Sequence, residues 1–149
     1  MSASDDAAVV ARILEAFSAR DFGATSGLAG DLVDMTSGRK ISGPAGLEEY
    51  WNGWIGAFPD GKLEITKNAA AEDGTVVTEF RARGTNKGPM ALGGQQIPAT
   101  GRKVDVMFCQ VSTVRDGKIV DARLYYDGMT LATQLGILPQ SQAAQSGTR

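Results

Sequence analysis

Apolar residues follow helical spacing over about the first 60 positions and alternate with polar residues over most of the remaining chain. The first amphipathic stretch, with i, i+3, i+4, i+7 spacing, predicts a helix whose apolar residues are Val10, Ile13, Leu14 and Phe17. Ser4 precedes two acidic residues and is expected to cap this helix, which should end near Arg20. A weaker helix is expected over residues 22–28, and a short strand over residues 31–36.

A further helix is expected to begin at Ser42-Gly43-Pro44, because proline in the first helical turn lacks only an N–H that would have no partner there. Pro59-Asp60-Gly61 should end it. Its apolar residues are Leu47, Tyr50, Trp51, Trp54, Ile55 and Phe58, with Tyr50, Trp54 and Phe58 on one face and Trp51 and Ile55 at its edge.

Four long strands are predicted over residues 63–70, 75–86, 102–114 and 118–126, where the period falls to two. Turns at Asp73-Gly74 and Asp116-Gly117 should join them in pairs, since glycine tolerates the positive φ of a tight hairpin. Helices followed by an antiparallel sheet indicate the α+β class. The link over residues 87–100 is too long for a tight hairpin and should cross one end of the sheet.

One face of each long strand is predicted to point inward. On residues 75–86 this is the even face, because the odd positions carry charges. Gln110 is an amide within an otherwise apolar inward row, so it should bond to neighbouring groups or contact a ligand. The inward rows of the last two strands are Val104, Val106, Phe108 and Gln110, and Val120, Ala122, Leu124 and Tyr126.

Composition narrows the possible functions. The 149 residues suit one domain, expected over residues 1–139 with a polar tail over 140–149. A net charge of -2 argues against nucleic acid as the main partner, and no apolar run is long enough to span a membrane. The chain has no histidine and one cysteine, Cys109, so a transition-metal site is not expected, and the single thiol suits a reducing cytoplasm.

Several segments together resemble the SnoaL-like polyketide cyclase family, and the resemblance covers nearly the whole chain. Gly84-Thr85-Asn86-Lys87-Gly88 is similar to the segment that precedes them in that family. The segments are Gly101-Arg102-Lys103-Val104, Val114-Arg115-Asp116-Gly117-Lys118-Ile119, Tyr126-Asp127 and Gln134-Leu135-Gly136.

The resemblance implies a nuclear-transport-factor-2-like cone, in which helices and a curved antiparallel sheet enclose an apolar cavity. Leu124 stands at the position of the catalytic aspartate of these cyclases, and Gln110 stands at that of a histidine. The arginine and aspartate of limonene epoxide hydrolases, which share the architecture, would fall near Phe80 and Ala82. The family pattern also implies that Asp34 points into the cavity.

In such a cavity, Asp34 would be the candidate proton-transfer group, with Gln110 as its catalytic partner. The alternative for Asp34 is a carboxylate at the rim, paired with Arg39, Lys40 or a backbone amide. Asp105 and Asp121 should point away from the cavity, and Asp127 should cap the last helix. The residues expected to contact the substrate are Tyr50, Trp54, Phe58, Phe80, Asn86, Phe108, Leu124 and Tyr126.

Two functions are compatible with these residues. The first is a cofactor-independent enzyme of cyclase or isomerase type, acting on a hydrophobic, polyketide-like small molecule. The second is a non-catalytic binding or accessory protein that has lost the aspartate and histidine of the family at Leu124 and Gln110. A homodimer is expected in either case, through the outward strand residues Met107, Cys109, Val111, Ile119 and Tyr125.

Overall fold

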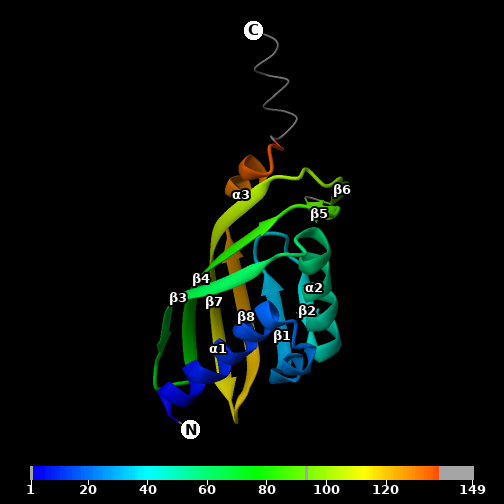
Figure 1. Ribbon diagram of the computed structural model, residues 1–149. Coiled ribbons are helices and arrows are strands. Elements are labelled where there is room, and N and C mark those ends of the chain that lie inside the picture. Colours follow the sequence, from blue (N-terminus) through cyan, green and yellow to red (C-terminus); the bar gives the residue numbers. More distant parts are fainter. Residues whose placement is uncertain (1, 93, 138–149) are drawn as a thin grey trace.

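The computed structural model describes residues 2–92 and 94–137. It has three helices at the N-terminal side, a curved six-stranded sheet, a small two-stranded hairpin and a short helix after the last strand (Figure 1). In chain order the elements are α1 (Ala3–Ala19), the 3₁₀ helix η1 (Phe22–Gly27), β1 (Leu28–Asp34), β2 (Lys40–Ser42), α2 (Gly43–Ala57), β3 (Lys62–Ala70), β4 (Thr75–Thr85), β5 (Met90–Leu92), β6 (Gln95–Ile97), β7 (Lys103–Arg115), β8 (Lys118–Tyr126) and α3 (Gly128–Gln134). The expected tail over residues 140–149 lies outside the described residues.

The main sheet has the strand order β2-β1-β8-β7-β4-β3. The predicted hairpins β3–β4 and β7–β8 are both present and antiparallel. The sheet is nevertheless mixed, because β1 lies beside β8 in parallel orientation. Alternation along a strand defines its two faces but not its neighbour, so the sequence could not place β1.

A glycine in β1 allows this strand to approach β8 closely. The strand begins at Leu28, three residues before the predicted start, and its register against β8 shifts between Leu28 and Asp31. A Cβ at Gly30 would lie 2.0 Å from the carbonyl oxygen of Val120, so only glycine allows the two backbones to approach this closely.

The predicted outward face of Ile119 is wrong, because the start of β8 is irregular. The β7–β8 pairing shifts between Thr113 and Val114, which changes the alternation at the start of β8. Ile119, expected to point outward, is 2% exposed and packs in the core, whereas Val120 is only partly buried. On β4 and β7 the predicted inward positions are buried or partly buried along the whole strand.

Helix ends differ from prediction at one point. The N-cap of α1 is Ser2 rather than Ser4, because Ser2 and Asp5 form a reciprocal capping box. Asp127 caps α3 as predicted and accepts a hydrogen bond from the backbone N–H of Met129 at 2.9 Å.

The link over residues 87–100 contains the hairpin of β5 and β6, which the sequence did not indicate. None of the described helices is long and apolar enough to cross a membrane.

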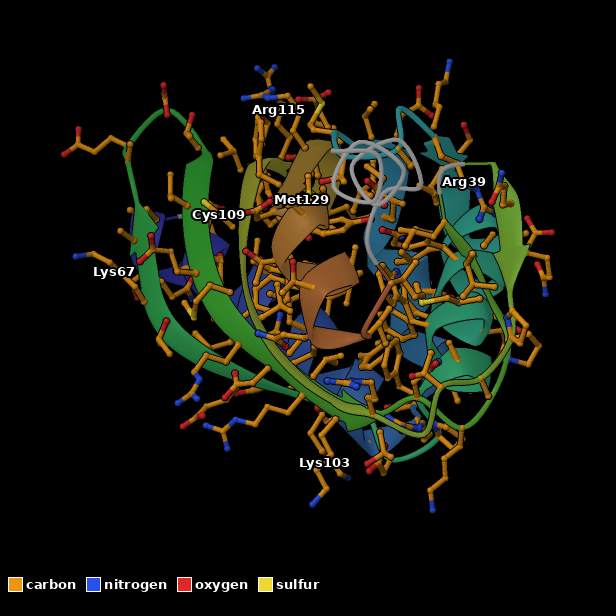
Figure 2. All side chains as sticks on the ribbon, turned by 90° about the horizontal axis from the view of Figure 1, so that it is seen from above. Arg39, Lys67, Lys103, Cys109, Arg115 and Met129 are labelled. Carbon is orange, nitrogen blue, oxygen red and sulfur yellow. The ribbon has the colours of Figure 1, made fainter. Side chains whose placement is uncertain are left out.

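Helix α3 lies between the curved sheet and α2 when the molecule is seen from above (Figure 2). The Gln134 side chain fastens it to the backbone of Asp105 by two hydrogen bonds, donating from Nε2 at 3.0 Å and accepting at Oε1 at 2.6 Å. Leu131 and Leu135 are almost completely buried beneath it. The helix therefore covers part of the apolar interior, and Leu131 contributes to its lining.

Candidate functional site

An apolar cavity of about 100 Å³ lies between the N-terminal helices and the inward face of the sheet. Helices α1, α2 and α3 and strands β1, β3, β4, β7 and β8 all contribute to its lining. Gln110 is the lining side chain that carries an amide, among mainly hydrocarbon neighbours. The aromatic residues of the lining are Phe17, Tyr50, Trp51, Trp54, Phe58, Phe80 and Phe108.

Three aromatic rings form a stacked row across the sheet. Phe80, Phe108 and Tyr126 are direct neighbours in the registers of β4, β7 and β8. Their ring centroids are 5.4 Å and 4.5 Å apart, with interplanar angles of 21° in both pairs. Trp54 of α2 meets Phe108 and Tyr126 edge-on at 6.0 Å and 5.8 Å, so α2 and the sheet form one continuous aromatic wall.

Asp34 lies at the end of β1, is 2% exposed and accepts four hydrogen bonds. Oδ1 accepts from the backbone N–H groups of Thr36 and Ser37, both at 3.0 Å. Oδ2 accepts from the hydroxyl of Tyr50 at 2.6 Å and that of Tyr126 at 2.9 Å. All four donors are neutral groups, two backbone amides and two phenols.

The two tyrosines connect this carboxylate to the aromatic wall. Burial, followed by the negative charge of Asp34, raises the pKa of Tyr50 and of Tyr126 above the ordinary tyrosine value. Both phenols therefore stay neutral at physiological pH and remain hydrogen-bond donors. Tyr50 lines the cavity, whereas Asp34 and Tyr126 lie behind the lining.

The alternative reading of Asp34 holds only in part. Its carboxylate does bond to backbone amides, in the turn that follows β1. Neither predicted cation pairs with it, because Arg39 binds Glu49 and Lys40 binds Asp31. The sequence offered no signal for the two tyrosine partners, which come from α2 and the end of β8.

Gln110 lies in a row of residues across the sheet that is polar except at Leu124. Its register neighbours are Thr78 on β4 and Leu124 on β8, and Leu124 in turn faces Asp34 on β1. The amide is 4% exposed and donates from Nε2 to Ser112 Oγ at 3.0 Å, a partner that the sequence analysis missed. Its Oε1 accepts no hydrogen bond from the described residues, so one end of the amide is available to a ligand.

The Gln110–Ser112 pair gives a test of how this amide contributes to stability. We expect Gln110→Leu to lower the free energy of unfolding by about 1–2 kcal/mol, because it leaves the buried Ser112 hydroxyl without its donor. The double variant Gln110→Leu/Ser112→Ala should recover most of that loss, since both partners become apolar. A double-mutant cycle measured by urea unfolding checks this. Additive losses would show that the two side chains are energetically independent.

Asn86 has a structural position rather than one in the cavity lining. It is 1% exposed, and its Nδ2 donates to the carbonyl oxygens of Ala57 and Gly88 at 3.2 Å and 2.9 Å. Its Oδ1 accepts from the backbone N–H and the hydroxyl of Thr100 at 2.7 Å and 2.9 Å. Protein groups thus satisfy the hydrogen-bonding capacity of this amide, and Asn86 is not among the residues that line the cavity.

The structure brings six of the predicted substrate-contact residues together in the lining: Tyr50, Trp54, Phe58, Phe80, Phe108 and Leu124. Trp51 and Ile119 line it as well, although the sequence placed the first at the edge of its helix face and the second outside. Asp105 and Asp121 point outward as predicted, where they pair with arginines. Within the described residues no three acidic, cysteine or histidine side chains are grouped as metal ligands would be.

Comparison with known proteins places the chain among small α+β proteins of one fold. Residues 7–135 match the SnoaL-like polyketide cyclase family. IdmH from Streptomyces antibioticus, a candidate polyketide cyclase, is 26% identical and has a TM-score of 0.71, with 89% of this chain and 99% of that chain covered. No curated protein sequence gives a significant match.

Two further solved structures extend the likeness. AclR from Streptomyces galilaeus, a candidate hydroxylase, is 23% identical with a TM-score of 0.75, covering 93% of this chain and 100% of that chain. A protein from Catenulispora acidiphila with a ketosteroid-isomerase-like fold is 19% identical with a TM-score of 0.71, covering 87% of this chain and 93% of that chain. The architecture is therefore the ketosteroid-isomerase or nuclear-transport-factor-2-like fold.

Proposed function

Because the chain belongs to the SnoaL-like polyketide cyclase family, we propose that it is a cofactor-independent enzyme of cyclase or isomerase type acting on a hydrophobic small molecule. The observation that carries the proposal is the buried carboxylate of Asp34, hydrogen-bonded to a phenol that lines an apolar cavity. Such a carboxylate, screened from water, is the kind of group that enzymes use to move protons.

The proton would pass through Tyr50. Tyr50 lines the cavity, and its hydroxyl donates to Asp34 Oδ2 at 2.6 Å. In one concerted step the ligand proton goes to Tyr50 Oη, and the phenolic proton goes to Asp34 Oδ2. The reverse step returns the proton to another atom of the ligand, so no redox cofactor is consumed. Gln110 would hold an oxygen of the ligand with the free end of its amide.

A β,γ-unsaturated ketone tests this proposal without knowledge of the natural substrate. In 3-cyclohexenone, removal of a proton from C2 and its return to C4 gives the conjugated 2-cyclohexenone, whose ultraviolet absorbance is easily followed. The protein should accelerate this isomerisation above the rate in buffer. Binding of the ketone with no acceleration would count against proton transfer.

The second candidate function is a binding or accessory protein without catalysis. Two observations favour it: Leu124 and Gln110 stand where the family has its catalytic aspartate and histidine, and protein groups already satisfy both oxygens of Asp34. This function predicts that Gln110 and Tyr126 control ligand affinity, while Asp34 matters little beyond the turn that it closes.

We also propose that the protein is a homodimer through the outer face of β4, β7 and β8. Met107 is 49% exposed there, with Tyr125 40% and Val77 37% exposed, on three adjacent strands. Cys109 and Val111 extend this apolar area at intermediate burial. An interface of roughly 1,600 Å² would be of standard size.

Light scattering at micromolar concentration should give the mass of two chains for the unmodified protein. Met107→Lys, which puts a charge on this face, should give the mass of one chain. Met35→Lys is the matched control, because Met35 is 46% exposed but lies in the turn after β1. A monomeric mass for the unmodified protein would rule out this interface.

A further inference from the structure

We propose that the cavity binds a hydrophobic cation, an ammonium group joined to an apolar body, in preference to a neutral molecule of the same shape. The inference deepens the proposed function, because it names the charge class of the ligand for the same cavity. It rests on an uncompensated buried negative charge and on the aromatic wall in front of it.

The negative charge of Asp34 has no cationic partner within the described residues. Its four hydrogen-bond donors are two backbone N–H groups and two phenols, all of them neutral. The Arg39 guanidinium lies over the Tyr50 ring at 5.6 Å from its centroid, but it pairs with the Glu49 carboxylate at 3.2 Å and not with Asp34. The attraction between a carboxylate and a cation is far stronger in a medium of low dielectric constant than in water. A buried carboxylate without a counter-ion therefore attracts a cation more strongly than an exposed carboxylate does.

The aromatic wall provides surfaces that a cation prefers. Trp54 is at its centre and contacts Tyr50, Phe58, Phe108 and Tyr126 at centroid distances of 5.8–6.2 Å. The faces of Trp, Tyr and Phe rings attract ammonium groups, and walls of several such rings are the usual sites for quaternary ammonium ligands. An ammonium beside Tyr50 would therefore lie close to several aromatic rings and in the field of Asp34.

The basic residues of the lining do not cancel this preference. Arg83 pairs with Glu64 at 3.0 Å and approaches Asp105 at 3.6 Å. Lys62 donates to the carbonyl oxygen of Ser18 near the C-terminus of α1, where the helix dipole is negative, and it is exposed to water. Lys62 is on β3 and Arg83 is on β4, and two strands separate β4 from β1 in the sheet. The side of the cavity near Asp34 therefore keeps its negative charge.

Phenyltrimethylammonium and tert-butylbenzene form the test pair, since they differ in charge but hardly in shape. Isothermal titration calorimetry of the full chain should show the cation binding at least about tenfold tighter than the neutral isostere. Asp34→Asn should reduce the affinity for the cation by about tenfold and leave that for the isostere unchanged. Asp31→Asn is the matched control on the same strand, since Asp31 pairs with Lys40 at the surface and should change neither affinity.

A second variant keeps the test decisive if Asp34→Asn does not fold. Trp54→Leu retains an apolar wall but removes the ring face, so it should weaken binding of the cation more than that of the isostere. Equal affinities for the two probes, tighter binding of the isostere, or no binding of the cation by the folded protein would each overturn the inference. Failure of this test leaves the isomerisation assay untouched, since the assay uses a neutral ketone and measures a rate.

Discussion

Asp34→Asn is expected to lower the rate of 3-cyclohexenone isomerisation by a factor of about 10²–10⁴, the usual contribution of a proton-transfer group. Asparagine has the shape of aspartate, and its Oδ1 can still accept from the N–H groups of Thr36 and Ser37. Its amide nitrogen cannot accept the proton of Tyr50, so the turn survives and the relay does not. Affinity for the ketone should stay within about tenfold, because Asp34 lies behind the lining.

The controls for this variant separate chemistry from structure. Circular dichroism and urea unfolding should show that Asp34→Asn keeps the native fold, and Asp31→Asn should retain the full rate. Tyr50→Phe should lower the rate as Asp34→Asn does, because it removes the hydroxyl that donates to Asp34 and would carry the proton. Full activity of a folded Asp34→Asn protein would remove the proposed catalyst, and none of the described residues that line the cavity carries a carboxylate to replace it.

Asn86→Ala should lower the free energy of unfolding by about 2–4 kcal/mol, the larger of the two stability effects predicted for this protein. The change removes four side-chain hydrogen bonds, one to Ala57 at the end of α2 and three to Gly88 and Thr100 at the two ends of the 87–100 segment. Ala57 keeps other donors for its carbonyl oxygen, from the N–H groups of Lys87 and Gly88. The Gly88 carbonyl and the Thr100 N–H lose their Asn86 partner, and each such loss costs roughly 1–3 kcal/mol when the group is buried.

Urea unfolding with an unchanged m-value measures this loss. Asn52→Ala is the matched control, because Asn52 is exposed on α2 and its replacement should change stability by less than about 0.5 kcal/mol. If Asn86 contacted the ligand instead, Asn86→Ala would leave stability intact and change only the affinity for the probes.

The sequence by itself determined the helices, the long strands and their inward faces. The reason is that these features depend on local interactions. A hydrophobic period of 3.6 or 2 indicates which side of an element is buried, and Asp-Gly at 116–117 indicates where a hairpin turns. The aromatic face of α2 and the outlying amide of Gln110 could be recognised for the same reason. Asp127 could be assigned to a cap because capping depends only on residues within one helical turn.

Only the tertiary structure decided which distant groups meet. The parallel contact of β1 with β8 brings Asp34 level with Leu124 and within reach of Tyr126, a residue 92 positions away along the chain. The shift in register near Val120 turns Ile119 inward, against the alternation of its strand. Asn86 and Gln110 are both buried amides, but protein groups occupy the first completely and leave one end of the second open. Periodicity defines the face of a residue, whereas its partners depend on the packing of elements that are far apart in the sequence.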